Sequence, residues 1–409
     1  MKSSHQPINF LPGPVAIHSE VRRALARPPI SHRGAAFMAT MAGVRRDLCR
    51  MTGASQVEIL LGSGTLANEA VAAQLSLLPG RGVVLNNGEF GARLASQARR
   101  WRLSFTELAA GWGEPLPFAE LRRTLEADPE IRWVWAVHCE TSTGVLNDLA
   151  GLRAILRESG VALCMDGISS IGNVPVDLSG VHLATGVSGK GLASFPGLAL
   201  VFHAEGIEPA PHLPHYLDLG SYARSESVPF TTSTNLVSAL SASLARFARE
   251  DGFAARRRLA AFLRTGLESL GFSVMAPEPI AAPMVLTLRP PPGVEALLLG
   301  EALEEQGIWL SYLSGYLVER NLLQVCLMGE HQHFEVEELL NVLAGKTRDG
   351  GDTLQSPAGR CRARISDLET KTDGTPSLDP LPPAEPLRLQ GEFRPGREHG
   401  GGRLRDPGR

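Results

Sequence analysis

The stretch Thr185-Gly186-Val187-Ser188-Gly189-Lys190-Gly191 contains Lys190, which is the one lysine between Ser3 and Gly345. Only four of the chain's 40 Lys and Arg residues are lysines, so positions that need no more than a positive charge are almost all arginine. A lysine amine can lose its proton and condense with an aldehyde, which a guanidinium cannot do. The small neighbours of Lys190 favour a narrow pocket around the amine, and a leftover surface lysine is the competing interpretation.

An acidic residue ends an apolar run upstream of this lysine. A buried strand of a parallel sheet is indicated by Ala162-Leu163-Cys164-Met165, with the Asp166 carboxylate at its carboxyl end. Open α/β sheets bind their ligands at that edge. Asp166 could therefore pair with a protonated pyridine nitrogen, as an electron-sink cofactor requires, or it could only cap the next turn.

A third stretch predicts an anion site. An apolar strand, a glycine-bearing turn and the start of a helix are indicated by Ile59-Leu60-Leu61-Gly62-Ser63-Gly64-Thr65. Such a turn can aim backbone N–H groups and two hydroxyls at an anion on the helix N-terminus. Ser63 and Thr65 could instead be ordinary helix caps. A nucleotide P-loop is excluded, because no lysine follows the second glycine and the spacing is wrong.

The order of apolar runs predicts an α/β fold with a mainly parallel sheet. Strand-like runs alternate with helix-like segments such as Leu149 to Ser159, and these runs are 83–85, 133–137, 162–165 and 198–202. A longer helical region follows from Leu236 to Leu270. The remainder predicts a small α+β domain, with strands near 284–288 and 322–327 and helices near 294–306 and 336–343.

These patterns divide the chain into four parts. We predict an N-terminal arm at residues 1–20, a large domain at 21–245, a small C-terminal domain at 246–346 and a disordered tail at 347–409. The tail is rich in glycine and proline and has no hydrophobic period, so it cannot bury enough surface to offset its ordering entropy.

Composition restricts the possible partners. A net charge of −3 argues against a nucleic-acid partner, and no apolar run is typical of a signal region or a membrane span, so a cytoplasmic location is expected. The five cysteines are odd in number and lack paired spacing, which argues against a disulfide framework and a zinc site. His331 and His333 have no acidic or cysteine partner at ligand spacing, so we expect a surface turn before the last helix and no metal.

Eight short motifs follow one another along the chain. They are Phe10–Pro14, Ser31–Arg33, Gly62–Thr65, Asn87–Gly91, His138–Leu146, Asp166–Gly172, Ser188–Lys190 and Phe230–Thr234. As an ordered set, which is far more specific than any single motif, they resemble the class V, fold type I family of pyridoxal-phosphate-dependent aminotransferases. The resemblance covers about residues 8–345, and within the family the chain is most similar to the 2-aminoethylphosphonate–pyruvate and alanine/serine–glyoxylate transaminases.

This resemblance implies roles for individual residues. Lys190 would form the imine with the cofactor aldehyde and later carry a proton between the substrate carbon and the cofactor. Asp166 would hold the pyridine nitrogen, Phe90 would stack on the ring, and Thr141 would bind the ring hydroxyl. The other cofactor-binding residues that the resemblance implies are Ser63, Gly64, Thr65, Ser188 and, from the second subunit of a homodimer, Thr231.

Two positions depart from the family pattern. Gly189 stands where a side-chain amide often precedes the lysine and contacts the phosphate. Gln324 stands where the family typically has an arginine that binds the substrate's carboxylate or phosphonate. Arg33 or another arginine could supply the missing charge, the substrate could lack an anion there, or the chemistry could differ. We therefore treat Arg33 and Gln324 as candidate substrate-binding residues and favour an atypical amino substrate.

Three functions are consistent with these residues. The first is a transaminase that moves an amino group between a small amino donor and an oxo acid such as pyruvate or glyoxylate. The second is a pyridoxal-phosphate lyase such as a cysteine desulfurase, which needs a cysteine in a mobile Gly/Ser-rich loop. Cys139 and Cys164 are in strand contexts and Cys49 is in a helical one, which disfavours it. The third, a non-catalytic interaction protein, is least consistent with the intact set of Ser63, Asp166 and Lys190.

Overall fold

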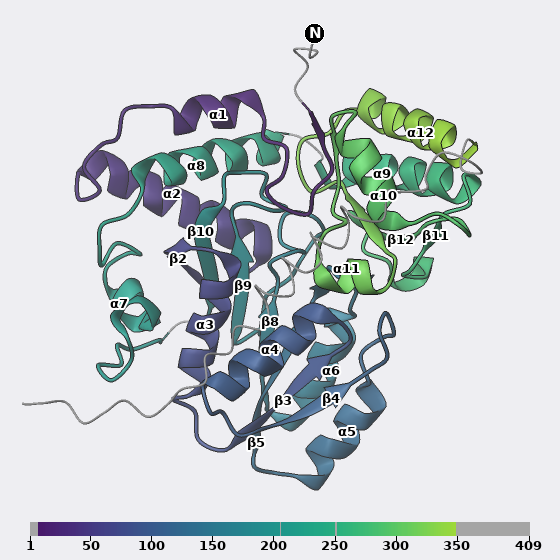
Figure 1. Ribbon diagram of the computed structural model, residues 1–409. Helices are drawn as coiled ribbons and strands as arrows, with labels where there is room; N and C mark the ends of the chain where they lie inside the picture. The colour runs from purple at the N-terminus through teal and green to yellow at the C-terminus, as the bar shows by residue number, and fades with distance from the viewer. Residues whose placement is uncertain (1–6, 205, 250–251, 349–409) are drawn as a thin grey trace, which may run out of the picture. The chain divides into compact units, whose positions relative to one another are not determined.

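The computed structural model describes residues 7–204, 206–249 and 252–348 (Figure 1). A seven-stranded sheet has the order β2-β10-β9-β8-β5-β3-β4. β10 runs antiparallel to both neighbours and the other adjacent pairs are parallel, which confirms the mainly parallel sheet. Its strands are β2 (Gln56–Gly62), β3 (Arg81–Asn86), β4 (Phe105–Ala109), β5 (Ile131–Val137), β8 (Ala162–Asp166), β9 (Leu183–Val187) and β10 (Gly197–His203).

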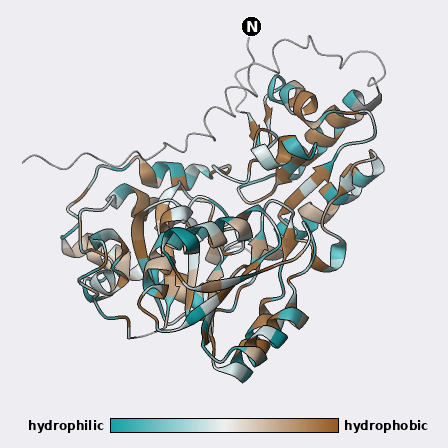
Figure 2. Cartoon of the chain, turned by 60° about the horizontal axis from the view of Figure 1, so that its bottom comes forward, coloured by the Kyte–Doolittle hydropathy of each residue, from teal (hydrophilic) through white to brown (hydrophobic). Residues whose placement is uncertain are grey.

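Both faces of this sheet are covered by helices. Successive strand residues point to opposite faces, so Ile59 of β2 lies in one apolar core and its neighbour Leu60 lies in the other. The first core is completed by α2 (Ala35–Thr52), α5 (Phe118–Ala127), α6 (Leu149–Ser159) and α8 (Thr234–Arg249). The second is completed by α3 (Gly64–Leu75), α4 (Glu89–Arg100) and α7 (Leu219–Arg224). Figure 2 shows the strands between these helices as mainly hydrophobic.

A second, smaller sheet follows in the chain. Its three antiparallel strands, in the order β11-β12-β14, pack against helices around a third apolar core. The strands are β11 (Ser273–Val274), β12 (Val285–Arg289) and β14 (Leu323–Cys326), and the helices are α9 (Gly252–Ser269), α10 (Ala296–Glu304) and α12 (His333–Arg348). The predicted small α+β part is therefore confirmed, while the residue boundaries between domains remain a prediction.

Short elements connect these layers. α1 (Ser19–Leu25) packs on α8, although more than two hundred residues separate them in the sequence (Figure 1). β1 (Ile8–Asn9) pairs in parallel with β13 (Ile308–Trp309), so the N-terminal arm lies against the second sheet's core. The remaining short elements are β6 (Cys139–Glu140), β7 (Val145–Leu146), α11 (Gly315–Glu319) and two single-turn helices at His215–Leu217 and Glu278–Ile280.

The predicted helical region from Leu236 to Leu270 contains α8 up to Arg249 and α9 from Gly252 to Ser269. One local prediction is wrong. The His331 side chain is buried, not on a surface turn, since the arm covers it and the Phe10 ring stacks on its imidazole with centroids 5.1 Å apart. Apart from residues 347 and 348, the predicted tail lies outside the described residues.

Within the described ranges, no helix combines the length and the apolar character that crossing a bilayer requires.

We expect Phe10→Ala to lower the free energy of unfolding by about 3–5 kcal/mol, because the Phe10 ring is fully buried and its removal leaves a cavity. The shift of the urea midpoint measures this loss. Phe334→Ala is the matched control, since its ring is 61% exposed and its loss should change stability by less than about 0.5 kcal/mol. Equal effects of the two substitutions would contradict the arm's packing role.

Candidate active site

A cavity of about 510 Å³ opens at the carboxyl ends of the parallel strands. Asp166 is the last residue of β8, and Lys190 follows the end of β9 by three residues. Helices α3 and α4 both begin at this edge, because each follows a strand that runs in the same direction as β8. The topology alone therefore brings a lysine, a carboxylate and two helix N-termini to one cavity.

Lys190 faces this cavity. Its Nζ donates a hydrogen bond to Ser169 Oγ at 2.9 Å and lies 5.4 Å from the centroid of the Phe90 ring. Burial lowers the pKa of Lys190, and the nearby Asp166 carboxylate opposes that effect. The lowered pKa raises the fraction of neutral amine at a given pH, and the neutral amine is the form that attacks an aldehyde or takes a proton.

Asp166 is held by two hydrogen bonds. Asn68 Nδ2 donates to Oδ2 at 2.8 Å, and the backbone N–H of Ile168 donates to Oδ1 at 2.9 Å. Thr185 Oγ1 donates to Asn68 Oδ1 at 2.9 Å, which turns the amide NH2 of Asn68 toward the carboxylate. Burial raises the pKa of Asp166, and both hydrogen bonds and Lys190 oppose that effect. A buried carboxylate oriented in this way suits a protonated ring nitrogen.

The N-terminus of α3 forms the other end of the cavity. Ser63 is the N-cap residue, has extended backbone and makes no side-chain capping bond, so its hydroxyl is available to a ligand. A Cβ built on Gly64 would lie 2.6 Å from Ile168 Cδ1, so a side chain at position 64 would require the Ile168 side chain to move. Free N–H groups at a helix start, with the helix dipole, favour an anion.

Glu140 is fully buried, and its side chain caps the N-terminus of α4. Its carboxylate accepts hydrogen bonds from the backbone N–H groups of Phe90 (3.1 Å) and Gly91 (2.9 Å) and from the Ser142 hydroxyl (2.5 Å). Burial raises the pKa of Glu140, and these hydrogen bonds oppose that effect. The contacts fix Phe90 at the cavity wall. Sequence analysis assigned Glu140 no role, although a lone carboxylate in a run of hydroxyl residues was a usable signal.

The structure brings most of the predicted site residues together. Seven of them line the cavity: Ser63, Gly64, Thr65, Phe90, Thr141, Asp166 and Lys190. Ser188 is buried and does not line the cavity, and its hydroxyl donates to Phe195 O at 2.6 Å. Thr231 and Arg33 are exposed and are not among the lining residues. Sequence analysis missed four side chains of the site, which are Asn68, Arg93, Glu140 and Ser169.

Gln324 is buried outside the cavity. Its Nε2 donates to Thr141 O and, at 2.8 Å, to Thr287 Oγ1, while its Oε1 accepts from Tyr316 OH at 3.1 Å. Both amide hydrogens are therefore used within the protein. Thr141 Oγ1 in turn lies 2.5 Å from Ser169 Oγ, the partner of Lys190. The Gln324 amide therefore holds the backbone of Thr141, whose hydroxyl contacts the hydrogen-bond partner of Lys190.

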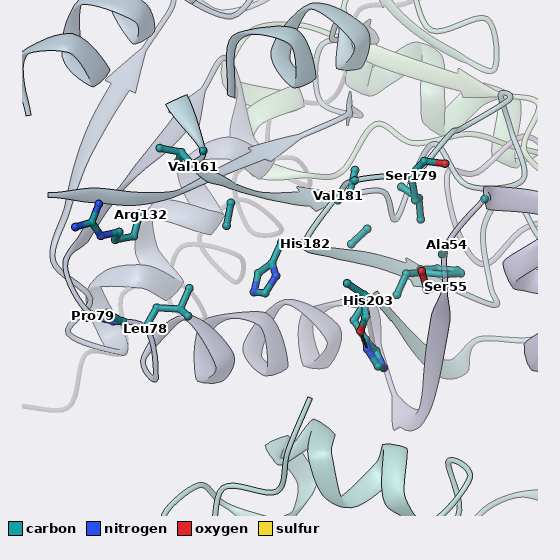
Figure 3. A pocket seen from close by; sticks show the side chains of 18 residues that line it. Ala54, Ser55, Leu78, Pro79, Arg132, Val161, Ser179, Val181, His182 and His203 are labelled. Atoms are coloured by element: carbon teal, nitrogen blue, oxygen red, sulfur yellow. Dashed lines mark hydrogen bonds between the residues drawn. The ribbon is translucent and has the colours of Figure 1, made fainter. Parts of the chain in front are cut away.

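Another cavity, of about 450 Å³, lies at the opposite edge of the same sheet (Figure 3). It is lined by the first residue of β8, Ala162, together with Arg132, His182 and His203. Burial lowers the pKa of His182. Because open α/β sheets bind ligands at the carboxyl ends of their strands, the Lys190 cavity is the better candidate for the active site.

The chain is similar in sequence and in fold to known aminotransferases. A family model described as aminotransferase class-V matches residues 16–213. A 2-aminoethylphosphonate–pyruvate transaminase of Paraburkholderia phymatum is 31% identical over 71% of this chain and 83% of its own length. A protein of Anabaena cylindrica named soluble hydrogenase 42 kDa subunit is 34% identical over 70% and 79%. The crystal structure of an alanine–glyoxylate aminotransferase from Nostoc sp. has a TM-score of 0.76 and 29% identity, covering 84% of this chain and 96% of that chain.

Glu140→Gln should lower the free energy of unfolding by about 1–3 kcal/mol, because an amide NH2 would face backbone N–H groups that now donate to a carboxylate. Urea denaturation of the apoprotein measures the change. Glu89→Gln is the control on the same helix, since the Glu89 side chain forms an exposed ion pair with Arg93 and the loss of that pair should cost less than about 1 kcal/mol. A Glu140→Gln variant as stable as Glu89→Gln would rule out the capping role.

Proposed function

We propose, from the premise that this chain belongs to the class V aminotransferase family, that it moves an amino group from a small amino donor to an oxo acid such as pyruvate or glyoxylate. Family membership makes it a pyridoxal 5'-phosphate-dependent aminotransferase. The observation that carries the proposal is the placement of Lys190 and Asp166 in one cavity with the free N-terminus of α3.

The cavity fits the cofactor. Pyridoxal 5'-phosphate supplies an aldehyde that condenses with amines and a pyridine ring that accepts electrons. Asp166 would hold the ring nitrogen, and Phe90 would cover one face of the ring. Thr141 would bind the ring hydroxyl, as the family resemblance implies. Ser63, Gly64 and Thr65 would hold the phosphate at the start of α3, where the capping hydroxyl is free.

Lys190 would act as the base that moves the proton. Its lowered pKa favours the neutral amine, and its hydrogen bond to Ser169 sets the direction of Nζ. Ser169 is itself held by Thr141. The amine can therefore take a proton from the carbon of a bound donor and return it at a neighbouring atom of the cofactor.

The cysteines give no support to the desulfurase alternative. Cys139, Cys164 and Cys326 are buried, and burial raises the pKa of each thiol, to about 12 for Cys139. Cys49 lies in α2, and burial raises its pKa as well. A nucleophilic cysteine needs the opposite, a lowered pKa and access to the substrate. Cys361 lies outside the described residues.

We also propose that the amino substrate is atypical for the family. Gln324 has no free amide hydrogen, so it supports the site through Thr141 and is a poor direct ligand for an anion. Arg33 is exposed and lies outside the cavity of its own subunit. A substrate carboxylate therefore lacks the usual small-domain arginine in this chain, which favours donors that do not depend on it.

We also propose that the protein forms a homodimer and is located in the cytoplasm. Thr231 is exposed and does not line the cavity of its own subunit, which supports a role at the cofactor phosphate of another subunit. Ile30 and Leu61 are two of the seven large hydrophobic side chains that are exposed in the described part of the chain, at 50% and 41%. A second copy of the chain would cover such side chains.

The test of the reaction is a single turnover with small amino donors. At least one donor should convert the bound cofactor to its amine form, seen as the loss of the aldehyde form's visible absorption. Borohydride treatment should leave the pyridoxyl group on the peptide that contains Lys190, and Lys190→Ala should lose both signals. A label on Lys2, Lys346 or Lys371 would contradict the assignment, and an absorbance unchanged by any donor would contradict the transaminase.

Sedimentation tests the dimer. A chain that ends at residue 348 should sediment as a dimer and keep its cofactor, because the residues proposed for the site and for its partner subunit all precede that position. Thr231→Ala should weaken cofactor binding while leaving the dimer intact. A cofactor-loaded monomer would refute the proposed role of Thr231.

A further inference from the structure

We propose that Arg93 is a ligand of the cofactor's phosphate and supplies the positive charge at that end of the cavity. This inference rests on the proposed function, since it requires bound pyridoxal phosphate. Arg93 carries the only guanidinium among the residues that line the cavity, all of which lie in the described part of the chain. The only other basic lining residue is Lys190, whose amine is needed for the chemistry.

The position of Arg93 follows from its neighbour on α4. Gln97 lies four residues further along the helix, on the same face, and its Nε2 donates to Glu69 Oε1 at 2.9 Å and to Thr65 O at 3.4 Å. Gln97 is therefore level with the first turns of α3. Arg93 lies one helical turn, about 5–6 Å, closer to the N-terminus of α4.

This difference of one helical turn along α4 places Arg93 beside the start of α3. Both helices begin at the carboxyl edge of the sheet, so a step toward the N-terminus of α4 is also a step toward Ser63 and Gly64. The guanidinium stacks 4.8 Å from the centroid of the Phe90 ring. It can therefore reach the phosphate end of a cofactor whose ring lies on Phe90.

Apart from Lys190, no other lining residue of this cavity, within the described part of the chain, offers this charge. Gly189, next to the lysine, cannot carry one, because a Cβ there would lie 2.8 Å from Pro196 Cα and 2.9 Å from its Cβ. The helix N-terminus contributes about half a unit charge, while a phosphate monoester carries between one and two negative charges at neutral pH. A bidentate guanidinium matches the remaining charge and the geometry of the oxygens.

Arg93 is also free to take a new partner. Among the described residues its one ion pair, to Glu89 Oε1, is 3.4 Å long, and the Arg93 side chain is 46% exposed. Exposed pairs of this kind contribute little to stability. Exchanging the carboxylate for a phosphate therefore costs little, and the stacking on Phe90 holds the guanidinium at the cavity in both cases.

The test compares two forms of the cofactor. Apoprotein is titrated with pyridoxal 5'-phosphate and with pyridoxal, which lacks the phosphate. Arg93→Gln should raise the dissociation constant of pyridoxal phosphate roughly tenfold or more, as expected for one lost charge-assisted contact, and should leave that of pyridoxal unchanged. Inorganic phosphate should compete with pyridoxal phosphate less well in the variant than in the parent protein.

Controls separate charge from packing. Arg93→Lys keeps a cation and should lose less affinity than Arg93→Gln. Arg100→Gln changes an exposed arginine on the same helix, away from the cavity, and should bind both ligands like the parent. The thermal midpoint of each apoprotein shows whether the variant folds.

Other outcomes overturn the inference. Equal weakening of pyridoxal phosphate and pyridoxal would mean that Arg93 acts by packing on Phe90. Unchanged cofactor affinity with a raised KM for a donor carboxylate would make Arg93 a substrate ligand. Normal binding and turnover in Arg93→Gln would refute this inference alone, whereas a parent protein that binds neither ligand would refute the proposed function itself.

Discussion

The buried carboxylate of Glu140 connects the elements on which the cavity depends. It satisfies the first backbone N–H groups of α4 and the hydroxyl of Ser142, which in turn accepts from the backbone N–H of Glu89. The backbone carbonyl of Ser142 accepts a hydrogen bond from Thr287 of the smaller sheet. The buried Glu140 carboxylate thus connects three parts of the protein, which are the N-terminus of α4, the segment that follows β5, and strand β12. Its removal would leave several buried N–H groups unsatisfied at once.

A second polar network runs from the smaller sheet to the lysine. Tyr316 and Thr287 hold the Gln324 amide, Gln324 holds the backbone of Thr141, and the Thr141 hydroxyl contacts Ser169, which binds Lys190. Every member is buried or partly buried, so each bond restricts its neighbours. Gln324 is therefore held within the protein, and it supports the hydrogen-bond network of Lys190 through Thr141.

The electrostatics of the cavity follow from a small number of groups. Asp166 is the one carboxylate among its lining residues, Lys190 and Arg93 are the basic ones, and the rest are hydroxyl, amide and apolar side chains. Burial shifts the pKa of Lys190 and of Asp166 toward their neutral forms, while each favours the charge of the other. A flat cofactor that carries a basic ring nitrogen, an aldehyde and a phosphate has groups that match these charges.

The sequence by itself determined the α/β class, the mainly parallel sheet and the place of Asp166 at a carboxyl strand end, because apolar runs define strands and their alternation with helices indicates a parallel sheet. The joint placement of Asp166, Lys190 and the Ser63 turn was implied by the family resemblance of the ordered motifs. Only the tertiary structure decided which side chains surround them. The capping by Glu140, the engagement of Gln324 and the level of Arg93 beside α3 depend on how helices and sheets pack. Contacts between residues that lie tens or hundreds of positions apart carry no local signal, because packing and not sequence spacing sets their distances.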